Sequence, residues 1–205
     1  GSEPWAIPNA AELPEIAPDF LVETDNLQPY SRDPETLARP WIKPGTEGLE
    51  HRVGGLEKAD LTGNVSYDPA NHHRMCTLRK DKVARIAATL PATVVTGNSA
   101  GGDLLVVGWG STYGSITTAV HKARAAGKDV SSVHLRHLNP LPPDLGDILR
   151  RFDKVLVPEL NLGQLVKVIR AEYLVNAKGC NKVQGLPFTV NELTQAIDAE
   201  LYGEV

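Results

Sequence analysis

The sequence predicts an α/β fold in which helices cover both faces of a mostly parallel sheet, a three-layer arrangement, preceded by an irregular N-terminal segment. Two observations carry this prediction. Beyond residue 71, short apolar runs typical of strands buried on both faces alternate with segments whose apolar residues recur at helical spacing. In the first third of the chain, by contrast, prolines and glycines are concentrated and exclude long regular elements.

The first 70 residues are expected to form an irregular connector. Eight of the fifteen prolines lie within residues 1–44, and glycines recur between residues 45 and 63. Such a segment cannot form a core of its own, yet it keeps large aromatic side chains, so we expect it to wrap over a protein surface. These aromatic residues are Trp5, Phe20, Tyr30 and Trp41.

Residues 71–205 are expected to form the α/β domain. The first helix is expected to stop before Pro91. Thr189 and Glu192 mark the start of the last helix, because at this spacing the side chain of each residue can bond the backbone N–H of the other. The predicted helices cover residues 71–90, 112–126, 145–152, 162–173 and 190–201, and the predicted strands cover residues 94–95, 104–109, 130–135 and 154–158.

Composition excludes several classes of protein. With 21 Lys and Arg against 25 Asp and Glu, the chain has no basic surplus for binding nucleic acid. No apolar run is long enough to span a membrane, and the N-terminus lacks the pattern of a signal peptide. Two cysteines are too few for a disulfide framework. We therefore expect a cytoplasmic protein with reduced thiols.

Three loops follow predicted strands at their carboxyl ends, where parallel sheets bind ligands. Residues 108–114 indicate either an anion-binding loop or a tight turn capped by Ser111 or Thr112. Residues 136–143 are proline-rich and carry a histidine. Residues 159–164 place an acid at a strand end and an Asn near a helix start, which indicates either a ligand loop or a helix cap, since Asn is a favoured cap. The candidate ligand or interface residues are Gly110, Ser111, Thr112, Tyr113, His137, Asn139, Glu159, Asn161 and Gln164.

The chemistry-bearing residues do not predict a catalytic site. Ser111, His137 and Glu159 are the residue types of a hydrolase triad, but Ser111 does not lie in a G-x-S-x-G turn and nothing in the sequence orders the three. No catalytic residue is therefore predicted.

Nor does the sequence predict a metal site. The neighbouring His72 and His73 point about 100° apart on a helix, and the histidines near residue 135 have no evident third ligand. Cys76 and Cys180 do not form a C-x-x-C pair, so we expect them to be buried free thiols.

Several segments nevertheless resemble one family. Taken together they are similar to the alpha subunit of 2-oxoglutarate:ferredoxin oxidoreductase, within the 2-oxoacid:acceptor oxidoreductases. The segments are SEPWAIP at 2–8, RPW and PGT at 39–46, HRVGGLE at 51–57, GWGSTYG at 108–114, VPELNLGQ at 157–164 and NKVQGLPF at 181–188.

The resemblance implies a place within a larger enzyme. Residues 71–205 would correspond to the domain similar to the C-terminal domain of transketolase. Residues 1–70 would correspond to the end of the pyrimidine-binding domain and a connector. The chain would then be the C-terminal part of an alpha subunit, a structural and assembly domain that is inactive alone.

The family reaction is also implied by the resemblance. It converts 2-oxoglutarate and coenzyme A to succinyl-CoA and CO2 and reduces ferredoxin. Thiamine diphosphate and Mg lie between alpha and a beta subunit that carries the iron–sulfur cluster. This chain has neither the G-D-G and Asn-Asn motif for Mg-diphosphate nor the cysteines for a cluster, so it is expected to bind none of these cofactors.

The expected partners are the beta subunit, the missing N-terminal domains of alpha and, through the complex, ferredoxin. The alternative function, from another class, is a freestanding anion- or nucleotide-binding α/β domain that uses the Gly108–Gly114 loop.

Overall fold

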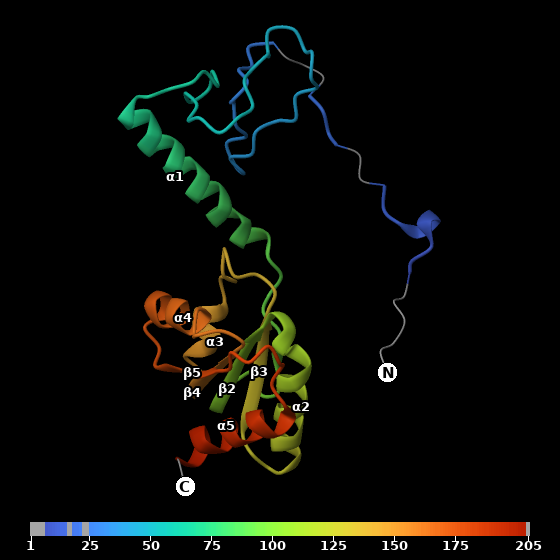
Figure 1. Cartoon of the computed structure of the whole chain (residues 1–205), viewed down its shortest axis with the longest axis vertical. Helices are drawn as coiled ribbons and strands as arrows, with labels where there is room; N and C mark the ends of the chain where they lie inside the picture. The colour runs from blue at the N-terminus through green and yellow to red at the C-terminus, as the bar shows by residue number, and fades with distance from the viewer. Residues whose placement is uncertain (1–6, 16–17, 22–24, 204–205) are drawn as a thin grey trace. The chain divides into compact units, whose positions relative to one another are not determined.

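The computed structural model describes residues 7–15, 18–21 and 25–203 (Figure 1). Trp5 and most of the 2–8 segment therefore lie outside the described residues. The chain divides into two compact units, residues 1–82 and residues 83–205. This boundary falls inside helix α1 (Pro69–Arg85), twelve residues beyond the predicted boundary at residue 70. Most of α1 belongs to the first unit because its first turns bond the loop that precedes it.

The first unit is irregular, as predicted. Apart from α1 it contains the 3-10 helix η1 (Ala10–Glu12) and isolated bridges such as Phe20 with Trp41. Those two rings pack edge to face with centroids 6.3 Å apart, although the Trp41 side chain remains 65% exposed. Among the described residues, only Leu49 and Met75 of this unit are buried apolar side chains. The described part of the first unit thus has almost no apolar core.

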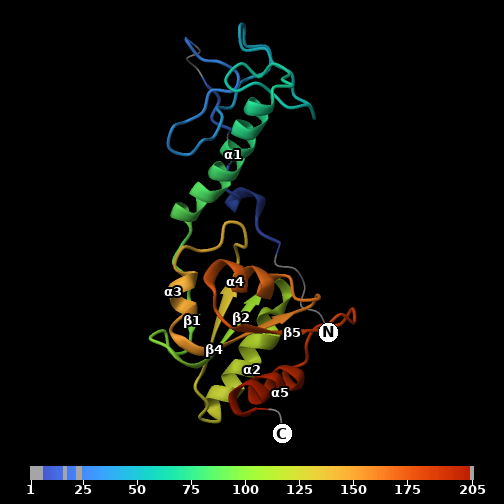
Figure 2. The same ribbon diagram turned by 90° about the vertical axis from the view of Figure 1, so that its left-hand side faces the viewer.

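The second unit is built on a five-stranded sheet (Figure 2). The strand order is β1-β3-β2-β4-β5, and every neighbouring pair is parallel except β1 with β3. β2 is the central strand, with β3 on one side and β4 on the other, so the predicted mostly parallel sheet is confirmed. The strands are β1 (Val95–Thr96), β2 (Gly102–Trp109), β3 (Val130–Leu135), β4 (Phe152–Glu159) and β5 (Ala177–Asn181).

Helices cover both faces of this sheet. α2 (Tyr113–Ala125) and α5 (Val190–Tyr202) share one apolar core with Leu104 and Val106 of β2. α3 (Leu145–Leu149) and α4 (Leu165–Tyr173) share another with Leu105 and Val107. Alternate β2 side chains point to opposite faces, so a continuous apolar run supplies both cores. The predicted three-layer arrangement is confirmed.

Several details differ from the sequence prediction. α3 ends at Leu149, and Phe152, which was expected on this helix, begins β4. α1 ends at Arg85, and the 3-10 helix η2 (Ile86–Thr89) follows within the segment predicted as helix.

β5 was not predicted, because Lys178, Gly179 and Asn181 are poor strand formers and the strand forms only at the sheet edge beside β4. Leu162 was expected on a helix but lies 77% exposed in the loop before α4. Gly163 has a φ of +80°, which is incompatible with a right-handed helix and delays its start to Leu165.

Among the described residues, no helix has the length and apolar character required to cross a lipid bilayer.

Candidate functional site

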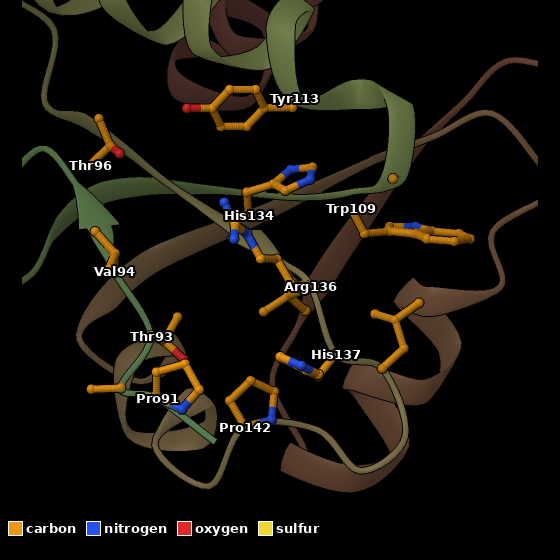
Figure 3. Close-up of a pocket in the computed structure, with 14 residues that line it drawn as sticks. Pro91, Thr93, Val94, Thr96, Trp109, Tyr113, His134, Arg136, His137 and Pro142 are labelled. Carbon is orange, nitrogen blue, oxygen red and sulfur yellow. The ribbon is translucent and has the colours of Figure 1, made fainter. Parts of the chain in front are cut away.

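A cavity of about 820 Å³ lies in the second unit at the carboxyl ends of β2 and β3. Its walls come from the ends of these strands, the start of α2 and the segments 91–96 and 134–142 (Figure 3). This is the edge of a parallel sheet at which ligands bind, and the connections from β2 and β3 lead to opposite faces of the sheet. The lining residues are Pro91, Ala92, Thr93, Val94, Thr96, Trp109, Gly110, Tyr113, His134, Leu135, Arg136, His137, Leu138 and Pro142.

The polar residues of the cavity favour an anion. The lining contains one arginine and two histidines but no carboxylate. The Tyr113 and His134 rings pack edge to face with centroids 5.0 Å apart. Burial and the nearby Arg136 guanidinium lower the pKa of His134, against the opposing effect of a hydrogen bond with the Gly110 backbone. The Arg136 guanidinium is a permanent positive charge in the cavity.

Three of the predicted site residues line this cavity: Gly110, Tyr113 and His137. Gly110 has a φ of +58°, in the left-handed region that favours glycine, and it begins the 3-10 helix η3 (Gly110–Thr112). The exposed Tyr113 begins α2 directly afterwards. The turn from β2 into α2 therefore presents backbone and an aromatic ring to the cavity.

Ser111, Thr112 and Asn139 are not among the lining residues. The buried Thr112 hydroxyl donates to the Trp109 carbonyl at 2.8 Å and accepts from the Trp109 N–H at 3.2 Å. These bonds support the tight-turn interpretation for Thr112. Ser111 and Asn139 are exposed.

Glu159 is completely buried at the end of β4, where it organises the start of α4. Its carboxylate accepts from the backbone N–H groups of Leu165 at 2.8 Å and Val166 at 3.0 Å. It also accepts from the Trp109 indole at 3.3 Å and the Asn161 amide at 3.1 Å. Asn161 in turn accepts from Gln164 N–H at 3.0 Å. Glu159 and Asn161 thus satisfy helix-start donors, as the capping interpretation predicts.

The structure does not assemble a triad from Ser111, His137 and Glu159. Only His137 lines the cavity, and the Glu159 carboxylate is occupied by four donors from other residues.

Sequence reasoning singled out the loop at residues 136–143 but did not include Arg136 or the preceding His134 among the candidate site residues. Only their position at the carboxyl end of β3 could have indicated from the sequence that they line a site. Both cysteines are free thiols, as predicted, but the prediction that both are buried is wrong. Cys76 is exposed on α1, and Cys180 is only partly buried. Cys76 is exposed because only one face of α1 carries apolar residues, and Met75 takes the buried position.

Comparisons with known proteins agree on one family. Residues 102–193 match the family described as pyruvate:ferredoxin oxidoreductase core domain II. The whole chain is 47% identical to the 2-oxoglutarate oxidoreductase subunit KorA of Mycobacterium tuberculosis, over 31% of that subunit. Over 87% of its length it is 28% identical to 2-oxoacid:ferredoxin oxidoreductase 1, subunit alpha, of Aeropyrum pernix, over 28% of that subunit.

The fold is also similar to a solved structure, 2-oxoglutarate:ferredoxin oxidoreductase from Magnetococcus marinus with 2-oxoglutarate, coenzyme A and succinyl-CoA bound. The TM-score is 0.83 and the sequence identity 28%, over 95% of this chain and 34% of that one. The chain thus spans about a third of the length of the relatives it matches.

Proposed function

We propose that this chain, which is homologous to a 2-oxoglutarate oxidoreductase subunit over its whole length, forms part of the alpha subunit of a thiamine-diphosphate-dependent 2-oxoglutarate:ferredoxin oxidoreductase. The assembled enzyme would convert 2-oxoglutarate and coenzyme A to succinyl-CoA and CO2 and reduce ferredoxin. The observation that carries the proposal is the 47% identity across all 205 residues.

Within this enzyme the chain would serve as a structural and assembly domain. The first unit supports that role because several of its large apolar side chains are exposed: Ile7, Trp41, Val53 and Tyr67 have exposures between 65% and 88%. Exposed apolar side chains of this kind are typical of surfaces that a partner covers. The covering surfaces would be the beta subunit and the remainder of alpha.

The cysteines of this chain do not form a cluster-binding set. Its two cysteines lie in different units and cannot supply a cysteine set for an iron–sulfur cluster. We therefore place the cluster in the rest of the complex, and we propose the same for thiamine diphosphate and Mg because the sequence lacks the G-D-G and Asn-Asn motif. The cytoplasmic location and the domain identities on either side of residue 70 stay predictions.

Native mass spectrometry of the endogenous protein tests this proposal. The protein would be captured with an antibody raised against residues 71–205. We expect a much longer polypeptide in complex with a second subunit. A dominant free species of 205 residues would contradict the proposal. Succinyl-CoA formation by the pure chain, supplied with 2-oxoglutarate, coenzyme A, thiamine diphosphate and an electron acceptor, would contradict its role as an assembly domain.

The cavity beside Arg136 supports a second candidate function, the binding of an anionic ligand by the second unit itself. Titration calorimetry with phosphate, nucleotides and coenzyme A tests it. Binding should be saturable, lost in Arg136→Ala and unchanged in Ser111→Ala, because Ser111 does not line the cavity. Absence of heat with all of these compounds would reject this candidate and leave the assembly role untouched.

A further inference from the structure

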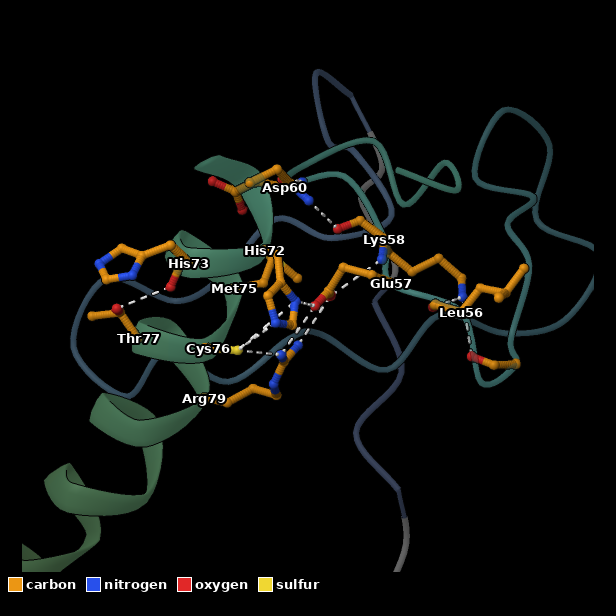
Figure 4. Close-up of polar contacts among 12 residues, drawn as sticks. Leu56, Glu57, Lys58, Asp60, His72, His73, Met75, Cys76, Thr77 and Arg79 are labelled. Carbon is orange, nitrogen blue, oxygen red and sulfur yellow. Dashed lines mark hydrogen bonds and ion pairs between the residues drawn. The ribbon is translucent and has the colours of Figure 1, made fainter. Parts of the chain in front are cut away.

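Three potential metal ligands, one from the loop before α1 and two from α1 itself, meet in the first unit (Figure 4). A carboxylate oxygen of Glu57, a ring nitrogen of His72 and the thiol sulfur of Cys76 all lie within 4.8 Å of one another. Glu57 Oε2 is 2.7 Å from His72 Nδ1, and Cys76 Sγ is 4.0 Å from the same nitrogen. Sequence analysis missed this group because Glu57 lies fifteen residues before His72.

The backbone holds these donors in place. His72 and Cys76 are four residues apart on α1, so they lie one above the other on the same helix face. The loop that carries Glu57 is tied to the same helix by Asn71. The Asn71 amide donates to the Lys58 carbonyl at 2.9 Å and accepts from Asp60 N–H at 2.9 Å. The site is therefore preorganised by bonds that do not involve the three donors.

The donor set matches a particular class of cation. One imidazole nitrogen, one thiol sulfur and one carboxylate oxygen are ligands of Zn²⁺, which binds N, O and S donors at about 2.0–2.3 Å. Tetrahedral coordination at such lengths separates neighbouring donors by roughly 3–4 Å, compared with 2.7 and 4.0 Å from His72 Nδ1 to the Glu57 and Cys76 donors. Three protein ligands leave a fourth position for water.

A cation already lies against these donors. The Arg79 guanidinium donates to both Glu57 carboxylate oxygens, at 3.1 and 3.2 Å, and to Cys76 Sγ at 3.2 Å. Its side chain is 56% exposed, so it can turn into solvent without disturbing a core.

We propose that Glu57, His72 and Cys76 form a binding site for a thiophilic divalent cation of the zinc class, which replaces the Arg79 guanidinium. The bound ion cross-links the Glu57 loop to α1. It therefore stabilises a unit whose described part has little apolar core.

Titration of the full chain with Co²⁺, a spectroscopic substitute for Zn²⁺, tests the site. We expect a thiolate-to-cobalt charge-transfer band that Zn²⁺ abolishes by competition. The band should disappear in Cys76→Ser and persist in the matched control Cys180→Ser. Affinity should fall roughly tenfold or more in His72→Ala and Glu57→Gln, and rise roughly tenfold in Arg79→Gln.

The substitutions of the three ligands and of Arg79 all lie at exposed or half-buried positions. Circular dichroism would verify that each variant is folded. A folded unmodified chain without the band would overturn the proposal, even if Arg79→Gln acquired one. A band that survives in Cys76→Ser or vanishes in Cys180→Ser would also overturn it.

Discussion

Glu159 illustrates how one residue can carry both a functional and a structural interpretation until its neighbours are known. From the sequence it is an acid at the carboxyl end of a strand, the position of many catalytic carboxylates. In the structure it is wholly buried and accepts four hydrogen bonds, two of them from the first backbone N–H groups of α4. Its role is to hold the β4–α4 connection.

Glu159→Gln should therefore destabilise the chain. The introduced amide places a donor among four donors and leaves part of the α4 start unsatisfied. We expect a loss of about 1–3 kcal/mol in the free energy of unfolding, measured by urea denaturation. Gln164→Ala is the control, since the Gln164 side chain makes no capping bond, and its change should stay within about 0.5 kcal/mol. Equal effects of the two substitutions would contradict the assigned role.

The hydrogen bonds of Glu192 should make the free energy of unfolding depend on pH in the acid range. Hydrogen bonds from Lys182 and Thr189 lower its pKa from 4.5 to about 2. Because the folded-state pKa is depressed, this contribution is fully present above pH 4.5 and is lost as the pH falls toward 2.

Thermal unfolding between pH 7 and pH 2 checks this dependence. Glu192→Gln should lower the melting temperature at pH 7, and the gap from the unmodified chain should narrow below pH 4.5. Glu172→Gln, an exposed substitution on α4 that leaves the Lys182 and Thr189 bonds to Glu192 intact, should produce no such convergence. A gap that stays constant down to pH 2 would rule out this role of Glu192.

At the scale of elements, the start of β2 depends on a close backbone approach. Gly101 has a φ of +138°, and a Cβ there would lie 2.3 Å from the Arg151 carbonyl oxygen in the connection from α3 to β4. Only glycine fits both the conformation and the space. Gly102 N–H also donates to the same carbonyl at 3.3 Å.

Gly101→Ala should therefore weaken the pairing of β2 with β4. We expect a destabilisation of roughly 1–3 kcal/mol by urea denaturation. Gly114→Ala is the matched substitution, since Gly114 lies in α2 with no atom within 4 Å of a new Cβ. It should be neutral or stabilise by up to about 1 kcal/mol. If Gly101→Ala proved as harmless as Gly114→Ala, the close approach would not matter for stability.

At the scale of the molecule, the two units differ in how they are stabilised. Two apolar cores bury most of the β2 and β4 side chains in the second unit, whereas only two buried apolar side chains belong to the described part of the first. Local opening has a lower free energy where little apolar surface is buried.

Limited proteolysis of the isolated chain should consequently cut the first unit before the second. Mass spectrometry should detect early cleavage between residues 25 and 68 and a persistent fragment that contains residues 95–202. Equal persistence of both units would contradict this expectation and indicate that the irregular unit is as stable as the sheet.

Much of this molecule was predictable from its sequence. The alternation of apolar runs and helical periodicity identified the three-layer fold, because those patterns reflect burial on two faces or on one. Motifs distributed along the chain identified the 2-oxoglutarate oxidoreductase relationship, which is confirmed by 47% identity over the full length. Gly110, Tyr113 and His137 line a cavity at the carboxyl end of the sheet, and their role as ligand or interface residues stays a prediction.

Tertiary structure alone decided which side chains share a site. Periodicity describes one element at a time. It could not show that the Glu159 carboxylate bonds the start of α4, or that Arg136 and His134 line the same cavity. Nor could it show that β5 pairs with β4 at the sheet edge. The group of Glu57, His72 and Cys76 has the same origin, because a loop anchored by Asn71 joins residues that no local pattern connects. Contacts between distant segments form only when the chain folds, and they determine the chemistry of each residue.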